Sequence, residues 1–147
     1  RNVTLAFAES CTGGLLGAAL TDISGSSDVF LGSAVCYSNS AKTHILSVSD
    51  ELLESFGAVS SECAIAMAKG ALNQFGSELA LSVTGVAGPG GGSEEKPVGA
   101  VWFALAGLCG ERAFLHHFPG DRLQIRRSAM NTGLLLLRKT VMELNIL

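Results

Sequence analysis

The chain has 147 residues, of which 48% are hydrophobic and 16% are charged, and its formal net charge is −3. This composition is that of one folded domain with a sizeable core, and it excludes a disordered chain. The weakly acidic balance argues against a nucleic-acid groove built on bulk charge, and no apolar run approaches the roughly 18 residues of a membrane span.

Apolar runs of strand length alternate with helical patterns along the whole chain. In chain order we expect strand 3–8, helix 15–23, strand 30–37, helix 40–46, helix 50–56, helix 63–75, strand 79–84, strand 98–106, strand 111–118 and helix 122–144. Ser40 and Ser49 are expected to cap two of the helices, and Asp121 with Gln124 resembles a capping box for the last one. The short connection at 108–110 predicts an antiparallel hairpin, so the elements indicate a mixed sheet with helices on both faces.

The turn at 9–14 (Glu-Ser-Cys-Thr-Gly-Gly) is the most informative stretch. A strand, a tight turn of small residues and a helix place the Ser10 hydroxyl at the carboxyl edge of the sheet, beside the free N–H groups of the helix start. Such a turn serves a nucleophile with an oxyanion hole, or cradles a phosphate, or is an ordinary connection. Cys11 is a rival nucleophile, because a helix start favours the thiolate.

Lys42 is the best candidate for a base near Ser10. If the second strand lies beside the first, Tyr37 and Lys42 emerge at the same edge as Ser10. A desolvated lysine can act as a base and a tyrosine can relay the proton, whereas the alternative is that Tyr37 packs and Lys42 extends into solvent. A Ser-His-Asp triad has little support, since His116 and His117 are adjacent on a strand and face opposite ways.

A glycine-rich loop follows the third strand, from Thr84 to Pro97. It is no P-loop, because G-K-[ST] is missing. A flexible surface loop is one interpretation, but long loops in compact domains are often functional and this one contains a polar segment at 93–96.

Metal and disulfide chemistry are not expected. The four cysteines are scattered without a C-x-x-C pair, and no cluster of His, Cys and carboxylates has metal-ligand spacing. The reducing cytoplasm is therefore the expected compartment.

Four motifs follow one another in a characteristic order. They are Ala-Glu-Ser-Cys-Thr-Gly-Gly at 8–14, Tyr-Ser-Asn at 37–39 with Lys42, Gly-Pro at 88–89 through Ser-Glu-Glu-Lys-Pro-Val-Gly at 93–99, and Phe-Pro-Gly-Asp-Arg at 118–122 with Arg126 and Arg127. Together they resemble the CinA carboxyl-terminal domain family, the nicotinamide-nucleotide amidohydrolases or NMN deamidases. The resemblance implies one domain over 1–147 with an α/β fold, a three-layer α/β/α sandwich whose sheet is mixed, mostly parallel, with one antiparallel hairpin. The resemblance also implies a helix before the first strand, and the printed sequence starts at that strand.

The resemblance also implies a reaction, the hydrolysis of nicotinamide mononucleotide to nicotinate mononucleotide and ammonia. It makes Ser10 the nucleophile and adds Tyr37 and Lys42 to the catalytic set. The expected substrate-binding residues are Cys11, Thr12, Gly13, Gly14, Thr84, Gly85, Gly88, Ser93, Lys96 and Arg126. Among these, N–H groups near the start of the helix are expected to hold the oxyanion, and the glycine-rich loop or Arg126 the substrate phosphate.

The family resemblance and the composition also indicate which partners to expect. We expect a small-molecule nucleotide as substrate, no cofactor, no metal, no nucleic acid, no membrane, and a homo-oligomer. The alternative function is a non-catalytic, nucleotide-binding regulatory or accessory domain of a competence/damage-inducible protein of the CinA type. Intact Ser10, Tyr37 and Lys42 favour the enzyme.

Overall fold

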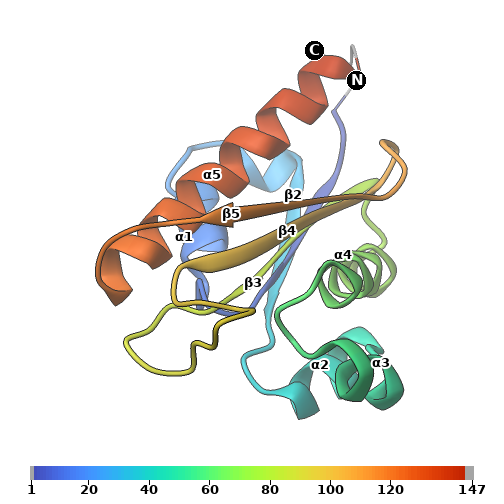
Figure 1. Ribbon diagram of the computed structural model, residues 1–147. Coiled ribbons are helices and arrows are strands. Elements are labelled where there is room, and N and C mark those ends of the chain that lie inside the picture. Colours follow the sequence, from blue (N-terminus) through green and yellow to red (C-terminus); the bar gives the residue numbers. More distant parts are fainter. Residues whose placement is uncertain (1, 145–147) are drawn as a thin grey trace.

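The computed structural model describes residues 2–144, in which five strands form one mixed sheet (Figure 1). Across the sheet the strands are β2 (Phe30–Val35), β1 (Leu5–Glu9), β3 (Leu79–Gly85), β4 (Ala100–Gly107) and β5 (Arg112–His117). β1 pairs in parallel with β2 and β3, whereas β4 pairs antiparallel with β3 and with β5. The mostly parallel mixed sheet and the β4–β5 hairpin are thus confirmed. The antiparallel β3–β4 pair was not predicted, and it arises because the glycine-rich loop reverses the chain.

Helices cover both faces of the sheet and make the expected three layers. The helices α1 (Leu15–Thr21) and α5 (Arg122–Glu143) lie on one face, with a short 3-10 helix η1 (Ser26–Asp28) ahead of β2. On the other face α4 (Ser61–Phe75) packs on the strands, and α2 (Asn39–Leu46) and α3 (Asp50–Phe56) pack against α4. No helix in residues 2–144 is long and apolar enough to cross a membrane.

The two faces of the sheet differ in side-chain size. Phe7, Leu81 and Phe103 belong to the core that also holds α1 and α5 residues, whereas Ala8 and Ala80 face α4. Successive residues of a strand point to opposite faces, so β1 sends its large side chains to one layer and its alanines to the other. The small residues let the alanine-rich helix α4 approach the sheet closely.

Most helix ends follow the predicted capping residues. Ser49 accepts a hydrogen bond from the Leu52 N–H, and Asp121 with Gln124 forms a complete capping box at the start of α5. Ser40 was the wrong choice for α2. The cap is Ser38, which has extended backbone angles and accepts from the Ala41 N–H, so it lies two residues before the expected cap and the helix begins at Asn39.

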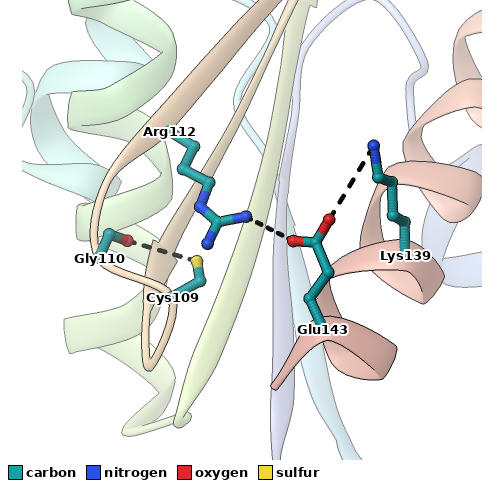
Figure 2. A network of polar contacts seen from close by, with 5 residues as sticks. All are labelled: Cys109, Gly110, Arg112, Lys139 and Glu143. Atoms are coloured by element: carbon teal, nitrogen blue, oxygen red, sulfur yellow. Dashed lines mark hydrogen bonds and ion pairs between the residues drawn. The ribbon is translucent and has the colours of Figure 1, made fainter. Parts of the chain in front are cut away.

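The far end of α5 is attached to the β4–β5 hairpin (Figure 2). The Glu143 carboxylate pairs with the Arg112 guanidinium at 2.8 Å and with the Lys139 ammonium at 3.9 Å, and the Cys109 thiol donates to the Gly110 carbonyl. The three charged side chains are accessible to solvent, and such ion pairs contribute little stability. The network lies at the end of α5 opposite to Asp121 and the predicted site.

Candidate active site

A cavity of about 310 Å³ opens at the carboxyl ends of β1 and β3. These strand ends lie at the lower end of the sheet in Figure 1. Its walls come from segments that are far apart in the chain: the turn after β1, the start of α2, the connection between α3 and α4, the glycine-rich loop and the first residue of α5. They include Ser10, Cys11, Tyr37, Asn39, Lys42, Thr84, Gly85, Gly88 and Arg122. Parallel strands end at one edge of a sheet, which is why these segments meet.

Ser10 and Lys42 are in direct contact. Ser10 follows β1, is buried, and donates its backbone N–H to the Val83 carbonyl of the neighbouring strand. The Lys42 Nζ lies 3.0 Å from the Ser10 Oγ and also donates to the carbonyl oxygens of Cys36, at 3.0 Å, and Tyr37, at 3.2 Å. Three acceptors saturate the three protons of an ammonium group.

The position of Lys42 depends on close packing of α2 against α4. A Cβ atom at Gly70 of α4 would collide with the backbone of Leu46 at the end of α2. Only 1% of Lys42 is exposed. Burial lowers the pKa of the Lys42 ammonium, because an apolar environment disfavours the charged form. The result is a lysine whose neutral form is promoted next to a serine hydroxyl.

Tyr37 contributes its backbone to Lys42 and its side chain to another residue. The Tyr37 hydroxyl accepts a hydrogen bond from Arg122 at 3.0 Å, and the same guanidinium donates to the Gly88 carbonyl at 2.6 Å. Arg122 therefore connects the second strand's end with the glycine-rich loop across the cavity. The proton-relay role of Tyr37 stays a prediction. A relay through this hydroxyl would operate while the hydroxyl accepts a hydrogen bond from the Arg122 guanidinium.

Glu9 occupies the start of α1, which differs from the expectation of free N–H groups there. Its buried carboxylate accepts hydrogen bonds from the N–H groups of Gly14, Leu16 and Gly17 and from the hydroxyls of Thr12 and Ser33. A carboxylate satisfies the unpaired donors and the positive end of the helix dipole. The start of α1 is consequently filled by the protein itself and not open to an anion.

Two N–H groups of the turn keep the capacity to hold an oxyanion. Gly13 donates to the Ser10 carbonyl, which closes the turn. Within residues 2–144, the N–H groups of Cys11 and Thr12 have no oxygen acceptor. These are the first two amides after the hydroxyl of Ser10, the usual neighbourhood of an oxyanion hole.

Cys11 lines the cavity, but its thiol is not activated. Burial raises the pKa of Cys11 to about 11, and this effect exceeds the opposing influence of Arg126 and Lys42. The expectation that the helix start favours a Cys11 thiolate is therefore wrong, because Glu9 has taken the helix N–H groups and the site is desolvated. Near neutral pH the thiol is protonated and a poor nucleophile.

The ten expected substrate-binding residues divide into two groups. Cys11, Thr84, Gly85 and Gly88 line the cavity; Thr12, Gly13, Gly14, Ser93, Lys96 and Arg126 are not part of its walls. The Thr84 hydroxyl donates to the Ala58 carbonyl at 2.9 Å.

The residues outside the cavity walls are engaged within the protein. Ser93 and Lys96 bond to each other through a local turn, and the Lys96 Nζ donates to the Phe56 carbonyl at the end of α3. Arg126 donates from Nε to the Cys11 carbonyl and from Nη2 to the Thr12 carbonyl. A substrate phosphate, which Arg126 was expected to bind, would have to compete with these two carbonyl oxygens for the guanidinium.

Sequence reasoning missed Glu9 and Arg122. A signal existed for each: Glu9 directly precedes a turn and a helix that lacks an acidic first turn, and Arg122 is the first residue of a helix that follows β5. Because β5 runs in the same direction as β1 and β3, its carboxyl end brings Arg122 to the same edge as Ser10. In the part of the chain that the structure describes, no group of three or more His, Cys, Asp or Glu side chains is arranged to hold a metal ion.

Comparison with known proteins gives consistent results. The family model of the CinA C-terminal domain matches residues 1–141. A CinA-like protein of Geotalea uraniireducens is 53% identical over 141 residues, covering 96% of this chain, and one of Synechococcus sp. is 59% identical over 122 residues, covering 83%. These alignments cover 34% and 29% of the two relatives, so the chain spans about a third of their length.

Solved structures with the same fold are also found. The competence/damage-inducible protein CihA from Agrobacterium tumefaciens is 44% identical with a TM-score of 0.88, and the match covers 95% of this chain and 86% of that one. A CinA superfamily protein from Klebsiella pneumoniae is 33% identical with a TM-score of 0.93, covering 97% and 89% of the two chains.

Proposed function

Since the chain belongs to the CinA C-terminal domain family, we propose that it is a serine amidohydrolase that releases ammonia from the carboxamide of nicotinamide mononucleotide. One observation carries the catalytic part of the proposal: the buried Lys42 Nζ lies 3.0 Å from the Ser10 Oγ in a cavity. The choice of substrate rests on the family resemblance and on the charge of the cavity.

In the first step the Ser10 Oγ attacks the carboxamide carbon. The neutral Lys42 amine takes the hydroxyl proton while it keeps its bonds to the two carbonyls. The negative oxygen of the tetrahedral intermediate lies against the N–H groups of Cys11 and Thr12. Collapse of the intermediate breaks the C–N bond, and the Lys42 ammonium gives its proton to the leaving nitrogen, which departs as ammonia.

Water completes the reaction. It enters the position that ammonia has left, and the neutral Lys42 removes its proton as it attacks the ester of Ser10. A second tetrahedral intermediate collapses with proton return to the Ser10 oxygen. The product is the carboxylic acid of the nucleotide, which ionises to the carboxylate by releasing its proton to solvent, and Ser10 and Lys42 are restored.

The cavity walls suit an anionic ligand. The Arg122 guanidinium lines it, and no Asp or Glu of the described residues does. Lys42 is buried next to Ser10, so Arg122 at the rim is the better group for a phosphate. A guanidinium binds phosphate oxygens through paired N–H groups. Arg122 would exchange its bonds to Tyr37 or Gly88 for those oxygens.

Ammonia release tests this proposal directly. The purified chain is incubated with nicotinamide mononucleotide, and ammonia and nicotinate mononucleotide are quantified against a Ser10→Ala variant. Equal amounts of both products from the wild type and none from the variant are expected. Binding of the nucleotide without any ammonia would instead indicate the non-catalytic nucleotide-binding domain.

A further inference from the structure

Arg126 lies one helical turn after Arg122 on α5 and contacts the turn that carries Ser10. Its Nε donates to the Cys11 carbonyl at 3.0 Å and its Nη2 to the Thr12 carbonyl at 3.1 Å. Arg126 is not part of the described cavity walls. Its guanidinium therefore acts on the turn and not on a ligand in the cavity.

The two hydrogen bonds of Arg126 hold the orientation of the peptide groups that follow Cys11 and Thr12. A peptide is planar and trans, so its C=O and N–H point in opposite directions. The Ser10 carbonyl, held by the Gly13 N–H, shares a plane with the Cys11 N–H. The Cys11 carbonyl, held by Arg126, shares a plane with the Thr12 N–H. Fixing the two carbonyls thus fixes the two N–H groups that have no oxygen acceptor.

We infer that Arg126 is a positioning residue for the oxyanion donors beside Ser10. It orients the Thr12 N–H directly, through the Cys11 carbonyl of the same peptide. It orients the Cys11 N–H indirectly, because it holds the Thr12 carbonyl, whose peptide carries the Gly13 N–H that bonds the Ser10 carbonyl. This inference rests on the proposed function in so far as Ser10 is a nucleophile. The fork of the guanidinium suits two successive carbonyls, which a lysine ammonium holds less well. A cation bonded to a carbonyl also polarises the peptide and strengthens its N–H as a donor.

Glu9 completes the support of this turn from the other side. Its carboxylate takes the N–H groups of Gly14, Leu16 and Gly17, whereas Arg126 takes carbonyl oxygens. The Glu9 carboxylate thus binds N–H groups and the Arg126 guanidinium binds carbonyl oxygens. Neither of them occupies the N–H groups of Cys11 and Thr12, which remain available to an oxyanion.

The test measures acylation of Ser10 by p-nitrophenyl acetate, a generic activated ester, alongside ammonia release from nicotinamide mononucleotide. The variants are Arg126→Ala and Arg126→Lys. Arg127→Ala is the matched control, because Arg127 is the next residue of the same helix, is exposed, and within residues 2–144 makes no hydrogen bond or ion pair. Ser10→Ala gives the background rate, and thermal unfolding checks that each variant is folded.

Arg126→Ala should lower the acylation rate about 100-fold, the scale of losing one oxyanion donor, while the KM for the nucleotide changes by less than about threefold. Added guanidinium ion should restore the rate of Arg126→Ala in a saturable way and leave Arg127→Ala unchanged. Arg126→Lys should be intermediate. A residue that only stabilises the fold would not give rescue by a small cation.

The outcomes separate the two proposals. Acylation of wild-type Ser10 without ammonia release means that the proposed substrate is wrong, and the Arg126 comparison is still decided by the acylation rates. Acylation of Arg126→Ala at the wild-type rate, or a slow rate that guanidinium does not restore, overturns the positioning role. If Arg126→Ala does not fold, wild-type acylation by Arg126→Lys overturns it. A wild-type chain that reacts with neither compound overturns both.

Discussion

The Lys42 Nζ contacts the Ser10 Oγ at 3.0 Å, although the two residues are 32 positions apart in the chain. Its other two bonds go to the carbonyl oxygens of Cys36 and Tyr37, which accept hydrogen bonds and cannot donate them. A neutral amine has two protons for those carbonyls and one lone pair, and the remaining direction is that of the Ser10 hydroxyl. The backbone thus orients the lone pair of Lys42 towards the proton it has to remove.

The pH dependence of activity should report the lowered pKa of Lys42. Burial favours the neutral amine, so the base form is present at a lower pH than for an ordinary lysine with a pKa of 10.5. The value of kcat/KM should rise with pH and level off below 10.5. The control variant Lys69→Arg, on the exposed face of α4, should show the same rise of kcat/KM with pH as the wild type. An apparent pKa of 10.5 or higher for the rise in kcat/KM, or a kcat/KM that does not change with pH, would contradict the role of Lys42 as the base.

Arg122 should determine affinity for the substrate phosphate. Arg122→Met should raise the KM for nicotinamide mononucleotide about 10- to 100-fold, the scale of a lost charge-assisted hydrogen bond. The same change should have little effect with nicotinamide riboside, which lacks the phosphate. Arg127→Met is the control and should behave as the wild type. Equal losses with both compounds would show that Arg122 acts through Tyr37 or the loop and not on phosphate.

Removing the charge of Glu9 should destabilise the fold. Glu9→Gln places an amide donor among groups that all donate, so at least one buried donor loses its acceptor. We expect a loss of about 3 kcal/mol in the free energy of unfolding, measured by urea titration. Glu94→Gln, in the exposed part of the glycine-rich loop, should change stability by less than about 0.5 kcal/mol. A Glu9→Gln protein as stable as the wild type would mean that the carboxylate is not needed at the start of α1.

Cys11→Ser should keep most of the activity. The pKa of the Cys11 thiol is raised to about 11, so the thiolate is scarce near neutral pH and iodoacetamide should label the native protein slowly at this position. Peptide mass spectrometry after timed alkylation measures the labelling. Loss of activity in Cys11→Ser together with an active Ser10→Ala would transfer the nucleophile to the thiol.

The amino-acid pattern predicts the layers of this fold better than the contacts inside the site. Strand-length apolar runs and capping residues such as Ser49 and Asp121 act locally, so they indicate where elements begin and end. The reversal of β4 was not predictable in this way, because it depends on the path of the glycine-rich loop. Ser40 was expected to cap α2, but the extended backbone that a cap needs is found at Ser38, and the pattern of residues does not reveal it.

The site itself was predicted in part. The meeting of Ser10 and Lys42 follows from parallel strands that end at one edge, and the structure places them in contact. The raised pKa of Cys11 could not be predicted from the sequence. It results from burial of the thiol, and Glu9 rather than Cys11 takes the N–H groups of α1; the spacing of residues along the chain shows neither. Arg126 illustrates the same limit: a cation near the site was expected to bind the substrate, but in the structure its donors are bonded to backbone carbonyls.

If Lys42 is the base for a Ser10 nucleophile, the decisive measurement is ammonia release by the Ser10→Ala and Lys42→Arg variants. Lys42→Arg keeps a positive charge but cannot lose a proton near neutral pH, so it should be inactive, as Ser10→Ala should be. Both variants should still bind nicotinamide mononucleotide in a calorimetric titration, since neither change removes the cation at the rim. A Lys42→Arg variant that releases ammonia at close to the wild-type rate would show that Lys42 is not the base, because another group would then have to take the proton of Ser10.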